Sequence, residues 1–318
     1  MKRAQLFTTA ALGGSAGMLG LACLFRQSHP VEQSPSLGKL SIFPPDNPWN
    51  QSIEKASVDP ASDQLIASIG KDLSLHPDFG FYYNGRHVGI PYCFTAPDTP
   101  KVPVRFEYEA ASDPGPYPIP KDAPIEGGPD SNGDRHLLII DRDNQKLYEL
   151  FAAYPEPGGG YRAGSGAIYD LRSNKLRPAG WTSADAAGLP IFPGLARYEE
   201  AVEQKAIRHA LRFTVKQTRR AYVSPARHFA SRSRDIQLPP MGMRVRLKAS
   251  YDLSGFPPSA RVILQALKTY GMILADNGGN WYLSGAPDSR WNSGEINTLK
   301  RVHGSDLEVV KMGPLTTG

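Results

Sequence analysis

The sequence predicts a mainly β fold, a sandwich or jelly roll with a few peripheral helices. Three observations favour this class. The 318-residue chain contains 31 glycines and 29 prolines, which is typical of many turns between short strands. Alternating stretches such as "VPVRFEYE" and "MRVRLKAS" indicate strands with one buried face. Apolar residues at helical spacing are confined to a few short stretches.

The first 25 residues have the layout of an export signal. Lys2 and Arg3 precede a mildly apolar stretch that runs from about Leu6 to Phe25. An uncleaved N-terminal anchor is the alternative, because the stretch is nearly long enough to span a bilayer. Cys23 follows "LGLA", a weak match to a lipoprotein signal. We therefore expect an extracytoplasmic protein, secreted or periplasmic, without stable membrane insertion after processing.

The rest of the chain divides into a leader and one folded part. Residues 26–42 are polar and lack periodicity, which predicts a flexible leader. Residues 43–312 are expected to form a single β-rich domain. The Pro-rich loops in this part do not separate two independent cores, so we expect one core.

Three short stretches predict helices. In "SDQLIASIG", Ser62 or Asp63 is the expected cap and Gly70 the stop. In "PPSARVILQALKTYG", Gly271 is the expected C-cap. The third stretch, "SGEINTLKRVHG", is expected to be capped by Ser293.

The stretch "GDRHLLIIDRDNQKLYELF" (residues 133–151) predicts a hairpin with charge on an apolar face. A turn at residues 143–144 places Leu138 opposite Glu149. His136 and Glu149 then become diagonal neighbours on one face of the sheet, close enough for a long side chain to bridge. A loop one residue longer or shorter would separate them.

The hairpin thus offers a cluster of Asp134, His136 and Glu149. Unpaired burial of a charge costs several kcal/mol, so these groups either satisfy one another or line a wet cleft. A structural network is the more common outcome for a histidine beside a carboxylate in a sheet. His209, on an apolar face, and His228, at an expected strand end, favour a functional site because packing alone does not require them.

The same site offers candidates for metal binding and for a further acid. His136, His209 and His228 with a carboxylate could hold a divalent metal, but no pair of them has local ligand spacing. We therefore expect no cofactor and keep a divalent metal as the lower-ranked alternative. Asp185 in "TSADAAG" either caps a short helix or joins the site.

Aromatic residues in or beside Gly-rich loops suggest a carbohydrate ligand. Tyr161, Trp181 and Trp281 could stack flat rings on sugar faces. Packing in the core is the alternative for each of them.

A basic segment suggests an anionic ligand. Between Lys205 and Lys248 the chain carries twelve lysines or arginines and one acid. Alternation in "IRHALRFTV" and "MRVRLKAS" predicts strands with a cationic outer face. Arg208, Arg212 and Arg227 are therefore expected to bind an anionic polymer such as a uronate or sulfated glycan, unless the face is merely solvated. The export signal and the absence of a known binding motif argue against nucleic acid.

Several stretches resemble a widespread group of uncharacterised secreted bacterial proteins. They are "GDRHLLIIDRD", "WTSADAAGLPIFPGLARY", "HALRFTV", "PARHFASRS" and "PPMGMRVRLKAS". With "DPGPYPIP", "PIEGG" and "YGMILADNG", the similarity spans residues 43–310. The resemblance implies export and carries no activity.

These observations favour an exported glycoside hydrolase that acts on a polysaccharide through paired carboxylates. Glu149 is the expected acid, with Asp134 or Asp185 as base or nucleophile and His136 tuning the pair. One alternative is a lyase on a uronate polymer, in which an arginine neutralises the carboxylate and a histidine or tyrosine takes the proton. The other is a non-catalytic glycan-binding or envelope protein. The sequence leaves the substrate and the oligomeric state open.

Overall fold

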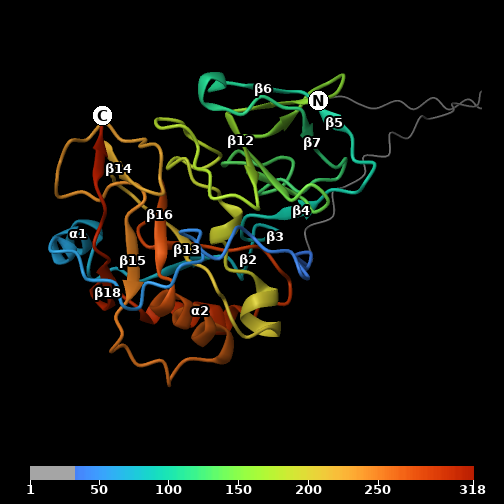
Figure 1. The fold of residues 1–318 in the computed structure, drawn as a ribbon. Helices are drawn as coiled ribbons and strands as arrows, with labels where there is room; N and C mark the ends of the chain where they lie inside the picture. Colours follow the sequence, from blue (N-terminus) through green and yellow to red (C-terminus); the bar gives the residue numbers. More distant parts are fainter. Residues whose placement is uncertain (1–32) are drawn as a thin grey trace, which may run out of the picture.

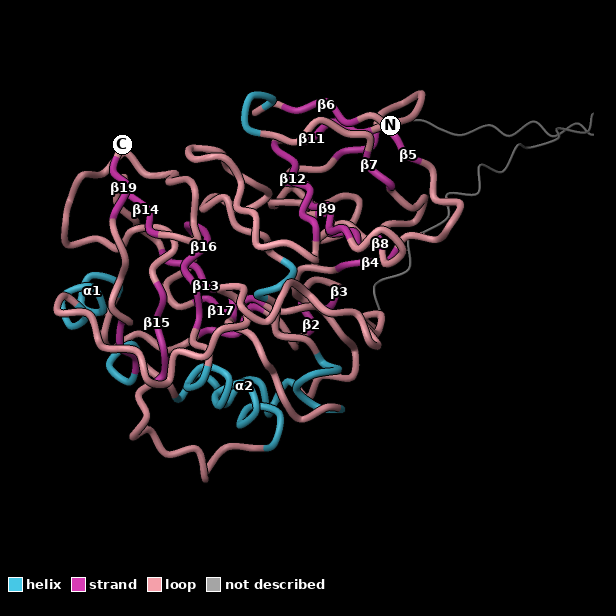
Figure 2. Tube along the Cα trace, viewed as in Figure 1, coloured by secondary structure: helices cyan, strands magenta, loops and turns pink. Residues whose placement is uncertain are grey.

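The computed structural model describes residues 33–318 and confirms a mainly β fold with few helices (Figure 1). In this part of the chain the α-helices are α1 (Ser62–Ile69), α2 (Pro258–Thr269) and α3 (Ser293–Asn297). Figure 2 shows α1 and α2 at the periphery. None of the helices described is long and apolar enough to cross a membrane.

A six-stranded mixed sheet forms the larger half of the molecule, at the lower left of Figure 1. Neighbouring strands are antiparallel except for two parallel pairs, β1–β17 and β13–β16. In sheet order the strands are β1 (His76–Asp78), β17 (Tyr282–Ser284), β13 (Leu211–Val215), β16 (Met272–Asn277), β15 (Arg244–Leu247) and β18 (Leu307–Val309).

A four-stranded sheet forms the other half and contains the predicted hairpin, drawn in green (Figure 1). Leu138 pairs with Glu149, so the register predicted from the sequence is confirmed. In sheet order the strands are β12 (Ser165–Asp170), β9 (Lys146–Phe151), β8 (Leu137–Asp141) and β4 (Tyr92–Phe94).

Smaller ribbons and single turns complete the fold. The ribbons pair β10 (Tyr154–Pro155), β11 (Tyr161–Ala163) and β6 (Val104–Phe106); β2 (Tyr82–Tyr83) and β3 (Arg86–His87); β5 (Lys101–Val102) and β7 (Tyr117–Pro118); and β14 (Ala221–Val223) and β19 (Leu315–Thr317). The turns are 3₁₀ at Glu109–Ala111, Phe192–Gly194, Thr298–Arg301 and Gly304–Asp306, and π-helical at Glu199–Glu203.

One hydrophobic core continues from sheet to sheet. Leu138 of β8 belongs to the same buried cluster as Phe213 of β13 and Leu274 of β16. The opposite face of β8, with Leu137 and Ile139, packs into a smaller second cluster. Because both faces of β8 are buried, the strand is a continuous apolar run up to its last residue.

The helix ends differ in part from the predictions. Gly271 follows α2 with a φ of 68°, and its N–H donates to the carbonyl of Ala266, as the sequence predicted for a C-cap. The cap of α3 is Asn292, whose side chain accepts the N–H of Glu295, and not Ser293. The side chain of Ser62 does not cap α1 either, because it accepts the N–H of Val309 in β18.

The predicted domain limits also shift. Within the expected leader, Leu37 is buried and its N–H donates to the Glu199 carboxylate, so residues 33–42 pack on the domain. At the other end, β19 pairs with β14 beyond residue 312. The predicted export signal and Cys23 lie outside the described residues.

The prediction of a cationic outer face on the two basic strands is wrong. All five residues of β13 are buried. In β15, Arg244 donates to backbone carbonyls and Arg246 pairs with Glu308. These arginines connect segments inside the protein, because a guanidinium can satisfy several acceptors at once.

Candidate functional site

A β-bulge turns Asp276 toward the polar face of the six-stranded sheet. The pairing of β13 with β16 shifts after Phe213, so that Thr214 pairs with Asp276 and Ala275 is the extra residue. In a regular strand Asp276 would share the buried face of Leu274. The bulge instead places it on the face of Thr214.

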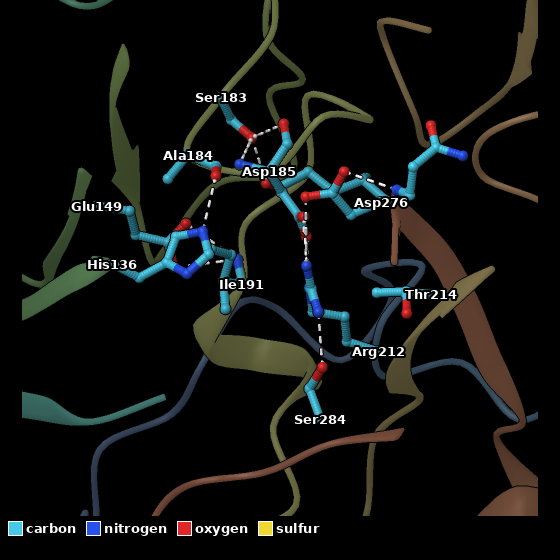
Figure 3. A network of polar contacts seen from close by, with 12 residues as sticks. His136, Glu149, Ser183, Ala184, Asp185, Ile191, Arg212, Thr214, Asp276 and Ser284 are labelled. Atoms are coloured by element: carbon cyan, nitrogen blue, oxygen red, sulfur yellow. Dashed lines mark hydrogen bonds and ion pairs between the residues drawn. The ribbon is translucent and has the colours of Figure 1, made fainter. Parts of the chain in front are cut away.

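The same bulge docks the loop that carries Asp185. The carbonyl of Ala275 accepts the N–H of Ala187 at 2.9 Å. Asp185 then forms a bidentate ion pair with Arg212, with Nε–Oδ2 and Nη2–Oδ1 distances of 2.7 and 2.6 Å. The remaining Nη1 of Arg212 donates to Oγ of Ser284. Both charged groups are buried, and this geometry satisfies them (Figure 3).

Asp276 lies beside this pair and remains partly exposed. Its Oδ2 is 3.6 Å from Nη2 of Arg212, and 23% of its side chain reaches solvent. Burial and the charge of Asp185 raise the pKa of Asp276 to about 7, although Arg212 opposes the shift. Asp276 therefore holds a proton in a large fraction of molecules at neutral pH.

His136 and Glu126 form a second charged pair, contributed by the segment before β8. Nδ1 of His136 is 2.6 Å from Oε2 of Glu126, and Nε2 is 3.2 Å from the carbonyl of Ala184. Burial alone would lower the pKa of His136, but the charge and hydrogen bond of Glu126 raise it to about 9. Both ring nitrogens face acceptors, which suits an imidazolium.

Glu126 is ionised and accessible. Burial would raise its pKa, but His136 holds this pKa below the usual value of a glutamate. Its side chain is 26% exposed. Asp78, the last residue of β1, is also exposed, and desolvation together with the charge of Glu126 raises its pKa.

These groups come together where the two sheets meet. We call them the carboxyl cluster: Asp78, Glu126, Asp185 and Asp276, with Arg212 and His136. Asp185 and Asp276 lie against Arg212, and their charges together with that of Glu126 raise its pKa, which burial would lower. The cluster can hold a proton on one accessible carboxyl and a charge on another, which is what acid–base chemistry requires.

Glu149, the predicted acid, is sealed inside the protein. It shares the predicted sheet face with His136, but each has its own partners (Figure 3). Glu149 is fully buried and accepts the N–H groups of Ile191 and Phe192 at 2.8 to 3.0 Å. Burial raises its pKa to about 7 against these donors. Glu149 holds the turn at Phe192–Gly194 in place. Because its side chain is inaccessible to solvent, it cannot protonate a polymer.

The other predicted acid and histidines lie apart from His136. Asp134 is exposed and acts on His136 and Asp78 only through its charge. His209 belongs to a separate buried network. His228 lies with Nδ1 at 2.8 Å from the carbonyl of Ala186, at the border of the Asp185 loop.

The metal hypothesis finds no geometric support. His136, His209 and His228 have different partners and do not converge. Between residues 33 and 318, no group of three or more His, Cys, Asp or Glu side chains is arranged to hold an ion.

The predicted ligand-binding aromatics and arginines do not form one surface. Trp281 is fully buried and stacks on Phe213, so its predicted role in sugar binding is wrong. Tyr161 packs half-buried on the smaller core, and Trp181 lies half-buried over Arg177.

The three arginines are equally dispersed. Arg208 is exposed just before β13, Arg212 is buried in the carboxyl cluster, and Arg227 is half-buried. Nε of Arg227 donates to the carbonyl of Arg177.

The sequence analysis missed Glu126, Asp78 and Asp276. Asp276 closes the apolar run "MILAD" and Asp78 ends "LHPD", so an acid after a buried strand was the available signal. Glu126 lies in a long Pro- and Gly-rich loop, where no period indicates which way a side chain points.

Comparisons with known proteins find no matching family model, no similar curated protein and no similar solved structure.

Proposed function

We propose that the protein is an exported glycoside hydrolase that acts on a polysaccharide through the paired carboxyl groups of Asp276 and Glu126. The observation that carries the proposal is that two accessible carboxyl groups, Asp276 of β16 and Glu126 of the loop before β8, act on the buried Arg212–Asp185 pair. Glycoside hydrolysis needs one carboxyl group that donates a proton and a second that is ionised.

Asp276 is the proposed general acid. It is accessible, and burial together with the charge of Asp185 beside it raises its pKa and favours the protonated form. Arg212 holds Asp185 in place through two short hydrogen bonds. Asp185 and Arg212 are therefore positioning residues, which act on the substrate only through Asp276.

Glu126 is the proposed base or nucleophile. Its Oε2 accepts from the ring and the backbone N–H of His136, and a quarter of the side chain remains accessible. His136 keeps Glu126 ionised and fixes its orientation. The anomeric configuration of the product distinguishes a base from a nucleophile, because only the latter gives retention.

A uronate lyase has less support from the same groups. A lyase needs a cation free to neutralise the substrate carboxylate and a base with an open lone pair. Arg212 is fully engaged by Asp185 and Ser284, and both nitrogens of His136 face acceptors.

A panel of neutral and uronic polysaccharides tests the proposal. We expect release of reducing ends, and a loss of at least about 100-fold in kcat for both Asp276→Asn and Glu126→Gln. Circular dichroism of both variants checks that they fold. Glu149→Gln is the matched control, because it should lower stability while folded molecules keep their kcat.

Other outcomes of the panel decide against the hydrolase. Products that absorb as unsaturated sugars identify a lyase. Glycan binding without turnover identifies the non-catalytic binding protein.

The export part of the proposal rests on the layout of residues 1–25. Fractionation of an expressing bacterium tests it, and cytoplasmic retention of the full-length chain would contradict it. Metabolic labelling with a lipid precursor, compared with Cys23→Ser, tests lipidation.

A further inference from the structure

A hollow lies next to the carboxyl cluster along the same strand. It has a volume of about 440 Å³, within the usual range of small-molecule sites. His76 of β1 lines it and points to the same side as Asp78, about 7 Å further along the strand. The lining residues are His76, Pro77, Gly80, Phe81, Ser293, Gly294, Ile296, Asn297 and Lys300.

The lining of the hollow differs in charge from the cluster beside it. None of the nine lining residues is acidic, and Lys300 supplies a positive charge at an exposed position. Ser293 and Asn297 add polar groups that can bind hydroxyls.

His76 gives the hollow a fixed wall. Its ring stacks on Tyr282 with 4.0 Å between centroids. Burial and the charge of Lys300 lower the pKa of His76, so the ring is neutral at neutral pH and able to accept a hydrogen bond. Lys300 is then the fixed positive charge in the lining.

Two exposed aromatic rings continue from the edge of the hollow. Phe81 leads directly into the β2–β3 hairpin, where Tyr82 and Tyr83 are 62% and 65% exposed. Among the described residues they are the only exposed large hydrophobic side chains adjacent in sequence. A single exposed tyrosine is ordinary, but two consecutive ones at the border of the hollow place an exposed ring on each face of the ribbon, and either ring can stack on a sugar.

The hairpin is close to the carboxyl cluster as well. The guanidinium of Arg86 in β3 packs against Gly128, two residues from Glu126, so tightly that a Cβ at Gly128 would lie 2.2 Å from it. The hollow, the two tyrosines and the cluster are therefore parts of one region.

We propose that this hollow is a subsite for a uronate residue of the polysaccharide, in which Lys300 binds the sugar carboxylate and Tyr82 or Tyr83 stacks on a neighbouring sugar. The inference rests on the proposed function, since it names the substrate class of the same site. An acidic sugar is favoured in the hollow and disfavoured at the carboxyl cluster, because like charges repel there. The charges of the hollow and the carboxyl cluster thus determine which sugar of the polysaccharide lies in each.

Calorimetric titration of Asp276→Asn tests the proposal without turnover. The probes are the tetramers of galacturonate, glucuronate and mannuronate, each compared with its carboxyl-reduced form. At low salt we expect at least one uronate to bind about tenfold more tightly than its reduced form, as one charge-assisted contact allows.

Second-site variants then assign the contacts. Lys300→Gln should abolish the preference for the charged tetramer, while Lys311→Gln, at another exposed lysine, should preserve it. Tyr82→Ala with Tyr83→Ala should weaken charged and reduced tetramers by the same factor.

The outcomes separate this inference from the hydrolase proposal. Equal affinity for charged and reduced tetramers, no binding of any tetramer, or an unchanged preference in Lys300→Gln overturns the subsite. Binding of uronates by wild-type protein that releases no reducing ends keeps the subsite and rejects the hydrolase.

Discussion

Two histidines in this protein lie beside a glutamate, but in different surroundings. His136 lies 2.6 Å from Glu126, and His209 lies 3.1 Å from Glu200. Glu126 is 26% exposed and opens onto other carboxyl groups, whereas Glu200 is 12% exposed. Accessibility, and not the pairing itself, therefore separates the candidate site from a structural contact.

The third partner of each pair explains the difference further. Arg197 donates to both Glu200 and His209, so the second pair is closed by a cation that cannot lose its charge. His136 has only acceptors around it, Glu126 and the carbonyl of Ala184. Its proton can leave when the pair is disturbed, so the first pair can adapt.

Removing each carboxylate gives the largest expected contrast. Glu200→Gln should lower the free energy of unfolding by about 3–5 kcal/mol, because Arg197 stays charged and buried. Glu126→Gln should lower it by less, about 2–3 kcal/mol, because His136 can become neutral. Urea denaturation at pH 7 measures both. Equal losses would show that the two pairs are equivalent and undermine the comparison.

The pH dependence of these losses sharpens the contrast. The pKa of Glu200 is lowered to about 2, mainly by Arg197 against burial, so its contribution is complete above pH 4.5 and fades toward pH 2. The pKa of His136 is raised to about 9 by Glu126 against burial, so its contribution is complete below pH 6.5 and is lost as the pH rises through 9. Wild-type protein and Glu126→Gln should therefore converge in stability at high pH.

An effect of the opposite sign is expected at Asp276. Its pKa, raised to about 7 by burial and Asp185, means that ionisation costs stability as the pH rises from about 4 to 7. Asp276→Asn should therefore be more stable than wild type at pH 8, by up to about 4 kcal/mol, while losing activity. Denaturation at pH 4 and pH 8 measures this. A variant less stable at pH 8 would contradict the raised pKa.

The sequence predicted the fold class and the hairpin register because both follow from short-range periodicity. The pairing of Leu138 with Glu149 needs only the turn position. What Glu149 contacts, however, depends on the N–H groups of Ile191 and Phe192, about forty residues away. No local pattern contains that information.

The carboxyl cluster was hidden for a related reason. A regular strand would direct Asp276 into the core, and only the extra residue at Ala275 turns it outward. Arginine alternation in β13 looked like an outer face, but Asp185 from a distant loop satisfies Arg212 inside the protein. Tertiary contacts thus give Asp276 and Arg212 orientations opposite to those that periodicity predicts.

The smallest effect is expected at Asp134, a residue that the sequence placed in the catalytic pair. It is exposed, and its influence on His136 and Asp78 is exerted through charge alone, which solvent and salt screen. Asp134→Asn should therefore change kcat less than threefold on any polysaccharide that the wild type cleaves, and the change should vanish in high salt. A loss as large as that of Glu126→Gln would move the acid–base pair back to the hairpin. Asp134 and Glu126 both act on His136 through their charge, but only Glu126 forms a hydrogen bond with it. Comparing the two variants therefore isolates the contribution of that hydrogen bond to kcat.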